Sequence, residues 1–182
     1  MRLISVQDDY VDFLRTYCPN VMDHKKECRQ HTRKYLGVVF EIGYLKYFIP
    51  LSSPKDYDTR SDGTPRNSDI FCSRMIGKDK QGRDIVFGKL MYAYMIPVPD
   101  SVIVEYDVDS EMDIKYRDLV RNEYDWIQLR LGQIKDKALS FYGLMIAGIY
   151  NHDDIRYQNV VDFASVEKAY DDYLKTNKKK SS

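Results

Sequence analysis

The sequence predicts an α+β domain with a twisted antiparallel sheet of about six short strands, followed by helices. Two observations support this class. Up to about residue 106, apolar and polar side chains alternate in short runs separated by turn residues, and after Ser110 apolar side chains recur at helical spacing. Most of the short runs are joined by turns, which favours antiparallel pairing. The 182 residues suffice for one well-buried core and are few for two, so we expect a single domain over residues 1–182.

The composition is that of a soluble globular protein, with 43% apolar and 31% charged residues. Because 28 basic residues balance 28 acidic ones, no overall positive field attracts nucleic acid, and any such binding must be local. Three cysteines without metal-ligand spacing favour a reducing compartment. The chain begins without an apolar leader and has no run long enough to span a membrane, so we expect a cytoplasmic protein with no membrane partner.

The first elements are a short strand over residues 2–5 and a helix that follows it. Ser5 and Asp8 have the spacing of a capping box, which predicts a helix that runs to about Thr16. Pro19 then prevents the helix from continuing.

Residues 24–34 form the densest basic segment of the chain. Within these eleven residues only Glu27 is acidic, and the basic and histidine side chains are His24, Lys25, Lys26, Arg29, His31, Arg33 and Lys34. A solvated loop is the simplest interpretation of such a segment. Its position directly before the next strand also makes it a candidate contact for an anionic ligand.

A β-hairpin is predicted next, with strands over about 35–42 and 45–49 and a tight turn at Gly43-Tyr44. In the first strand every second side chain is apolar, and this set should face the core: Leu36, Val38, Phe40 and Ile42. A hairpin brings its two outer ends together. We therefore expect Arg33 and Lys34 to lie near residues 50–53.

The middle of the chain contains a long polar loop and further strands. Residues 52–68 are almost entirely polar or turn-forming, and loops of this length are commonly functional or mobile. Strands are predicted over 70–76 and 102–106, and one or two strands over 85–97. A turn around Gly82 should connect the strand over 70–76 to the segment 85–97.

Three helices are predicted in the last third of the chain. The apolar spacing indicates helices over about 116–131 and 134–149, with a break near Gly132. A last helix should begin after Asp162, which is a good N-cap residue. The lysine-rich tail, residues 178–182, is expected to be disordered.

The candidate site is the turn that follows the hairpin, where Ser52 and Ser53 lie between two prolines and are followed by Lys55. Ser-Ser-Pro is also a common turn sequence in its own right. The sequence has no metal-ligand constellation, no P-loop and no nucleophile elbow, so we expect neither a metal nor a cofactor.

Cleavage of RNA by its own 2′-hydroxyl suits a site made of hydroxyls and cations. The phosphorane is more negative than the ground state, so prepositioned lysine, arginine and hydroxyl donors stabilise it selectively. The reaction also needs a base for the 2′-proton and an acid for the departing 5′-oxygen. His31 is the default base, and a lysine whose pKa is lowered by neighbouring cations is the alternative.

The segment 34–55, above all Pro50-Leu51-Ser52-Ser53-Pro54-Lys55, resembles the endoribonuclease toxins of type III toxin-antitoxin and phage abortive-infection systems, the ToxN/AbiQ family. A weaker resemblance continues at residues 95–98 and 162–163. It implies a compact fold in which helices surround a strongly twisted antiparallel sheet, similar to the Kid/MazF toxin fold. It also implies metal-independent cleavage that leaves a 2′,3′-cyclic phosphate and a 5′-hydroxyl, and inhibition by a small structured RNA transcribed from tandem repeats.

The resemblance also implies roles for individual residues. Ser53 matches the catalytic serine of the family and Lys55 its active-site lysine, while Ser52 stands where relatives can carry threonine. Arg33 stands where a relative has lysine, which retains a phosphate-binding charge but not a group that can lose its proton. The expected catalytic set is Ser52, Ser53, Lys55 and Arg33, and the expected RNA-binding set is Lys25, Lys26, Arg29, His31, Lys34 and Tyr57.

Two hypotheses follow. The first is a sequence-preferring endoribonuclease toxin that acts on cellular or phage RNA and is held inactive by its RNA antitoxin, in a cyclic protein-RNA assembly. The alternative is a non-catalytic RNA-binding module that uses the same basic rim. Such a module would bind RNA in a salt-sensitive way without turnover.

Overall fold

The computed structural model describes residues 3–22, 36–150 and 153–180, with side chains described up to residue 177. In these residues seven strands pair antiparallel in the order β4-β5-β3-β2-β1-β7, and β6 pairs with β3. The strands are β1 (Ile4–Val6), β2 (Leu36–Ile42), β3 (Leu45–Ser52), β4 (Cys72–Lys78), β5 (Asp84–Met91), β6 (Ile96–Pro97) and β7 (Ile103–Glu105). The α-helices are α1 (Asp8–Tyr17), α2 (Ile114–Gln128), α3 (Leu131–Ile146) and α4 (Phe163–Lys180).

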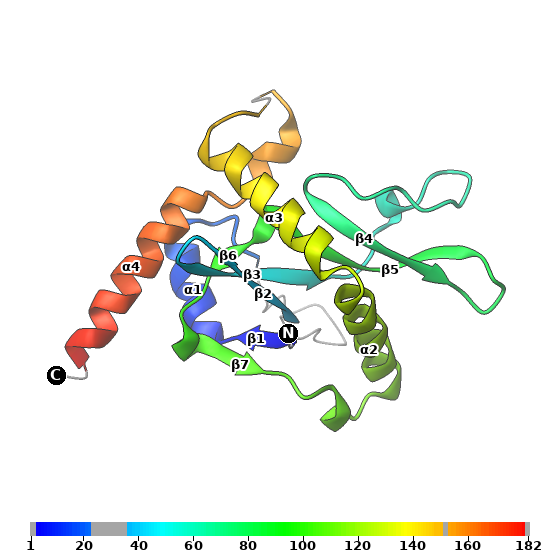
Figure 1. Ribbon diagram of the computed structural model, residues 1–182, viewed down its shortest axis with the longest axis horizontal. Coiled ribbons are helices and arrows are strands. Elements are labelled where there is room, and N and C mark those ends of the chain that lie inside the picture. Colours follow the sequence, from blue (N-terminus) through cyan, green and yellow to red (C-terminus); the bar gives the residue numbers. More distant parts are fainter. Residues whose placement is uncertain (1–2, 23–35, 151–152, 181–182) are drawn as a thin grey trace.

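The arrangement confirms the predicted α+β class. Helix α3 crosses the sheet, α1 and α4 pack against each other, and the β4–β5 hairpin lies at the opposite end of the molecule from α1 and α4, with α2 next to β5 (Figure 1). No helix within the described ranges is long and apolar enough to cross a membrane.

The β2–β3 hairpin forms as predicted, with Gly43-Tyr44 as the connecting turn. Its register runs from Gly37 opposite Pro50 to Ile42 opposite Leu45. Gly43 has φ +61°, a left-handed conformation that glycine adopts without a steric penalty. Strand β3 extends to Ser52, so the first serine of the candidate site belongs to the sheet.

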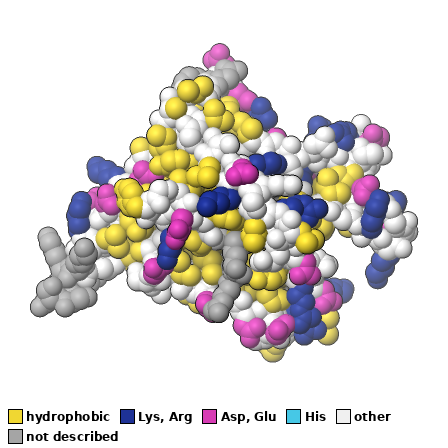
Figure 2. All heavy atoms as spheres, viewed as in Figure 1, with side chains coloured by type: hydrophobic (Ala, Val, Ile, Leu, Met, Phe, Trp, Pro, Cys, Tyr) yellow, Lys and Arg dark blue, Asp and Glu magenta, His cyan; other side chains and the backbone are white. Residues whose placement is uncertain are grey.

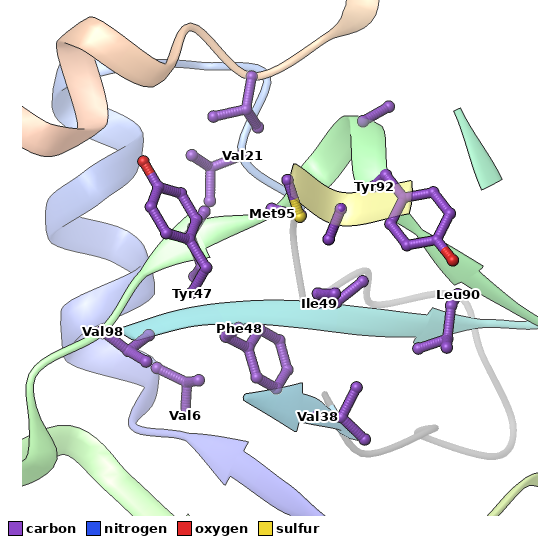
Figure 3. Close-up of a cluster of buried hydrophobic side chains, with 14 of the residues drawn as sticks. Val6, Val21, Val38, Tyr47, Phe48, Ile49, Leu90, Tyr92, Met95 and Val98 are labelled. Carbon is purple, nitrogen blue, oxygen red and sulfur yellow. The ribbon is translucent and has the colours of Figure 1, made fainter. Parts of the chain in front are cut away.

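Strand β3 is buried on both faces. Tyr47, Phe48 and Ile49 are fully buried, and Tyr47 and Phe48 point to opposite sides of the strand (Figure 3). On β2, three side chains of the predicted core set are buried, namely Leu36, Val38 and Ile42, whereas Phe40 is only half-buried against the core. The burial of Phe48 reflects the place of β3 near the middle of the sheet.

The predicted capping box before α1 is wrong. Ser5 lies in β1, where it pairs with Leu36 on one side and Val104 on the other. The N-cap residue is Gln7, whose side chain makes no capping hydrogen bond. The helix ends at Tyr17, before Pro19 as expected.

Of the one or two strands predicted over 85–97, two form, β5 and β6, and a 3₁₀ turn, Tyr92–Tyr94, separates them. Two long-range hydrogen bonds account for the interruption, since Ala93 N–H donates to the carbonyl of Phe71 and the carbonyl of Ala93 accepts from Val161 N–H. Residues 100–102 also form a 3₁₀ turn, so the following strand is shorter than predicted.

The helices lie close to their predicted positions. The break between α2 and α3 falls at Leu129-Arg130, and Gly132 lies inside α3. Helix α4 follows Asp162, whose carbonyl accepts from Val166 N–H as expected of an N-cap residue. Because α4 continues to Lys180, it extends into the segment 178–182 for which disorder was expected.

Candidate active site

The end of strand β3 places Ser52 beside two buried cations. Ser52 lies opposite Lys89 of β5, and Lys89 lies opposite Arg74 of β4. Residues directly opposite one another in antiparallel strands point to the same face of the sheet. Ser52, Lys89 and Arg74 therefore form a row across three strands, on one face.

The residues after Ser52 form an accessible turn. Ser52 and Ser53 are half-buried, Lys55 is exposed, and the side chain of Tyr57 is 63% exposed. The hydroxyl of Ser52 donates to the carbonyl of Ser53 at 3.4 Å. A short 3₁₀ turn, Asp56–Asp58, then reverses the chain. The sheet thus presents two hydroxyls, an ammonium group and an aromatic ring within six consecutive residues.

Asp58 is the fully buried centre of this region. Its Oδ2 accepts from the backbone N–H of Lys55 at 2.8 Å and from Lys89 Nζ at 2.7 Å. Its Oδ1 accepts from Arg74 Nε at 2.8 Å. Lys89 is 1% exposed, so the carboxylate and both of its cationic partners are removed from water.

The protonation of Asp58 follows from these contacts. Burial alone would raise the pKa of this carboxyl, but the hydrogen bonds from Lys89, from the Lys55 N–H and from Arg74 outweigh burial and hold the pKa below its ordinary value. Asp58 is therefore ionised at neutral pH.

Arg74 also holds the long polar loop in place. Its Nη1 donates to the carbonyl of Asn67 at 2.6 Å and to Asp69 Oδ2 at 3.1 Å, and its backbone N–H donates to Ser68 Oγ at 2.8 Å. On the other side of the cluster, Lys89 Nζ lies 4.9 Å from the centroid of the Tyr57 ring, a cation–π contact. The loop predicted over 52–68 is thus folded against β4 and β5.

The described part of the chain holds four of the predicted site residues in one stretch: Ser52, Ser53, Lys55 and Tyr57. The other six lie outside the described residues: Lys25, Lys26, Arg29, His31, Arg33 and Lys34. The expected approach of Arg33 to residues 50–53 is a prediction about that segment. The β2–β3 pairing that motivates it is present as far as Gly37 and Pro50.

Sequence reasoning missed Asp58, Arg74 and Lys89. A usable signal was present, because Arg74 and Lys89 are single cations within otherwise apolar or small runs of two neighbouring strands. A lone cation in a buried strand requires a buried anion nearby. Asp58, in a loop full of polar residues, did not stand out as that anion.

The surface near the site carries charges of both signs. Lysine and arginine side chains gather over the β4–β5 hairpin, with acidic ones beside them (Figure 2). Lys78 pairs with Asp84 at 2.8 Å and Arg83 with Asp79 at 2.7 Å. In the described ranges, no three His, Cys, Asp or Glu side chains converge as a metal site would require.

Comparisons with known proteins match nearly the whole chain. A family model described as "Toxin ToxN, type III toxin-antitoxin system" matches residues 2–171. Endoribonuclease ToxN of Bacillus thuringiensis subsp. kurstaki is 26% identical over 180 residues, which cover 97% of this chain and 86% of the relative. Endoribonuclease ToxN of Pectobacterium atrosepticum is 20% identical over 175 residues, covering 96% and 95%. Endoribonuclease AbiQ of Lactococcus lactis subsp. lactis is 28% identical over 109 residues, which cover 60% of this chain and 57% of the relative.

Solved structures share the fold. One, from a bacterial antiviral system regulated by a processed non-coding RNA, matches with a TM-score of 0.75 at 17% identity and covers 94% of this chain and 98% of the other. AbiQ, a lactococcal anti-phage endoribonuclease, matches with a TM-score of 0.69 at 21% identity and covers 96% of this chain and 98% of its own. A third structure is of a type III toxin, which a non-coding RNA pseudoknot inhibits selectively. It matches with a TM-score of 0.68 at 23% identity and covers 95% of this chain and 97% of the other. Because the family model spans almost all of the sequence, the chain belongs to the ToxN toxin family of type III toxin-antitoxin systems.

Proposed function

We propose that this protein is a metal-independent endoribonuclease toxin that cleaves RNA at the turn following β3 and is inhibited by an RNA antitoxin. The observation that carries the proposal is the accessible Ser52-Ser53-Pro54-Lys55 turn, fastened to the sheet in a chain of the ToxN family. The relatives that match over most of the chain bear the name endoribonuclease, which supports this activity.

The proposed chemistry is attack of the substrate 2′-hydroxyl on the adjacent phosphorus. A 2′,3′-cyclic phosphate forms and the 5′-oxygen leaves, so that no external nucleophile is consumed. Negative charge develops on the phosphorane oxygens, where the Ser53 hydroxyl and the Lys55 ammonium can stabilise it. Ser52 supplies a second hydroxyl, and Arg33 is proposed as an additional phosphate-binding cation.

The proton transfers are assigned by chemical type. Lys55 and His31 are the candidate groups for removing the 2′-proton and protonating the 5′-oxygen, since arginine keeps its proton. Tyr57 exposes an aromatic ring on which a base can stack. The basic segment with Lys25, Lys26, Arg29, His31 and Lys34 is proposed to contact the RNA backbone.

The proposed partners are RNAs. Cellular or phage transcripts are the substrates, and a small RNA derived from tandem repeats is the inhibitor, bound in a cyclic protein-RNA assembly. The inhibition of a structurally similar toxin by a non-coding RNA pseudoknot supports this partner, and the anti-phage role of AbiQ supports a function in abortive infection.

A direct test incubates the purified protein with RNA in excess chelator and determines the product ends. The proposal predicts cleavage that chelation leaves intact, with 2′,3′-cyclic phosphate and 5′-hydroxyl ends. Products ending in a 3′-hydroxyl would contradict the mechanism. Salt-sensitive RNA binding without any cleavage would instead favour the non-catalytic RNA-binding module.

Ser53→Ala tests the location of the site. We expect a loss of kcat of about 100-fold or more, because a donor to the developing oxyanion is removed. Circular dichroism and antitoxin RNA binding should remain close to those of the parent protein. Ser61→Ala, which changes an exposed serine of the same loop, is the matched control and should cleave normally. Normal cleavage by Ser53→Ala would place the site elsewhere.

A further inference from the structure

We infer that Asp58 is the positioning residue of this active site, a role that rests on the proposed ribonuclease function. Its carboxylate accepts the backbone N–H of Lys55, the residue that follows Ser53-Pro54. The turn is therefore held at both ends, at Ser52 by the sheet and at Lys55 by Asp58.

The contacts form a closed ring that begins and ends at Lys89. The backbone of Ser52 pairs with Lys89 in the β3–β5 ladder. From Ser52 the chain runs through Ser53 and Pro54 to Lys55, whose N–H donates to Asp58 at 2.8 Å. Asp58 Oδ2 in turn accepts from Lys89 Nζ at 2.7 Å, which completes the ring. Both ends of the Ser53-Pro54 segment are therefore held by one residue of β5.

A second hydrogen bond between Lys55 and Asp58 makes the closure reciprocal. The backbone N–H of Asp58 donates to the carbonyl of Lys55 at 2.8 Å, while the Asp58 carboxylate accepts from the Lys55 N–H. Pro54, between Ser53 and Lys55, further restricts the backbone because its φ is fixed by the ring. Few conformations of the Ser53-Lys55 segment satisfy all of these constraints.

The charge of Asp58 is essential to this arrangement. A neutral acceptor could take the Lys55 N–H, but it would remove the anion that pairs with Lys89, which is 1% exposed, and would leave Arg74 with Asp69 as its acidic partner. A buried cation that loses its anion is strongly disfavoured. The ion pairs fix Asp58 to β4 and β5. Because Asp58 accepts the Lys55 N–H, they also fix the backbone that carries Ser53 and Lys55.

A positioning role predicts a specific kinetic effect. Asp58 is fully buried beneath the turn, so it does not contribute binding energy to the RNA by direct contact. Displacement of Ser53 and Lys55 by about 1 Å can cost on the order of 100-fold in rate. Loss of the Asp58 hydrogen bond should therefore lower kcat and leave KM nearly unchanged.

The experiment compares Asp58→Ala with a matched control, Asp79→Ala. Asp79 also accepts backbone N–H groups, from Gln81 and Arg83, but at the tip of the β4–β5 hairpin. We expect Asp58→Ala to lower kcat by about 100-fold with KM within about twofold, and Asp79→Ala to leave both unchanged. Rates are measured well below each melting temperature. An Asp58→Ala protein with the kcat of the parent would overturn the inference.

The double variant Asp58→Ala/Lys89→Met separates positioning from stability. It removes the cation that Asp58→Ala leaves unpaired, while Arg74 keeps Asp69 as a partner. The melting temperature should recover towards that of the parent protein, whereas kcat should stay as low as in Asp58→Ala, because Lys55 still lacks its acceptor. Recovery of kcat together with the melting temperature would show that Asp58 acts only through stability.

Amide hydrogen exchange gives a readout that does not depend on cleavage. In the parent protein the Lys55 amide should be protected, and in the double variant it should exchange about tenfold faster or more. Unchanged protection would overturn the inference. A parent protein that cleaves no RNA would refute the proposed function itself, whereas equal cleavage by parent and variants would refute only the role of Asp58.

Discussion

At the scale of single residues, Asp58 shows how one buried charge can organise a site made of exposed groups. Its carboxylate accepts hydrogen bonds from one backbone amide and two cations that come from β4 and β5. The polar loop is long, and long loops are costly to order. The ion pairs offset that cost at the one point where the loop carries the candidate catalytic residues.

The lowered pKa of Asp58 predicts a loss of stability in acid. The folded-state pKa lies below the ordinary value of about 3.9, so the unfolded chain takes up this proton before the folded protein does as the pH falls. The stabilisation is present above about pH 4 and is lost as the pH falls through the folded-state pKa.

Urea denaturation between neutral and acidic pH measures this effect. The free energy of unfolding of the parent protein should fall more steeply below about pH 4 than that of Asp58→Asn/Lys89→Met, which lacks the titrating pair. Parallel curves for the two proteins would show that Asp58 does not titrate differently on folding.

At the scale of elements, the β2–β3 hairpin determines where the site lies, because the register that ends near Gly37 and Pro50 brings the end of β3 into line with β5. Gly37 is required for close packing within this hairpin. A Cβ at this position would lie 2.3 Å from the carbonyl oxygen of Ile49 and 2.6 Å from the ring of Phe48. Both neighbours are fully buried and have little room to move.

Gly37→Ala should therefore destabilise the fold by about 1–3 kcal/mol, the usual cost of overpacking in a core. Gly143→Ala is the matched control, since Gly143 lies in α3 and a Cβ there would meet nothing within 4 Å. It should stabilise the protein by up to about 1 kcal/mol through helix propensity. Chemical denaturation of both variants checks the prediction, and equal stabilities would contradict it.

At the scale of the whole molecule, a shared carboxylate joins the sheet to two helices. Glu167 Oε1 of α4 accepts from the hydroxyl of Tyr47 of β3 at 2.5 Å and from that of Tyr142 of α3 at 2.8 Å. Burial, followed by the Glu167 hydrogen bond, raises the pKa of Tyr47. Tyr47 therefore remains a neutral donor, and a strand from the first third of the chain meets α3 and α4 at one oxygen.

Tyr47→Phe should cost about 1.5–3 kcal/mol, because it removes a hydrogen bond to a charged group from a fully buried position. Tyr44→Phe is the matched control, because Tyr44 is 87% exposed at the hairpin turn and its change should stay within about 0.5 kcal/mol. Thermal unfolding of both variants measures the difference. A Tyr47→Phe protein as stable as the control would show that the Glu167 contact contributes nothing.

The sequence allowed the sheet, the hairpin turn and most helix bounds to be predicted, because these follow from local periodicity and from glycine or proline at particular positions. Prediction failed where a distant partner decided the outcome. Ser5 pairs with two strands instead of capping a helix. Between one and two strands over 85–97 the sequence did not decide, and two form because Phe71 and Val161 bind the backbone of Ala93. Such competition between partners is invisible in a short window of sequence.

By itself, the sequence determined the fold class, the hairpin and the Ser52-Ser53-Pro54-Lys55 turn, since adjacent residues carry all of that information. Only the tertiary structure decided that Asp58, Arg74 and Lys89 meet beneath the turn. The physical reason is desolvation. Charges far apart in the sequence are forced to pair only when folding removes them from water, and the energy of that pairing depends on the completed core.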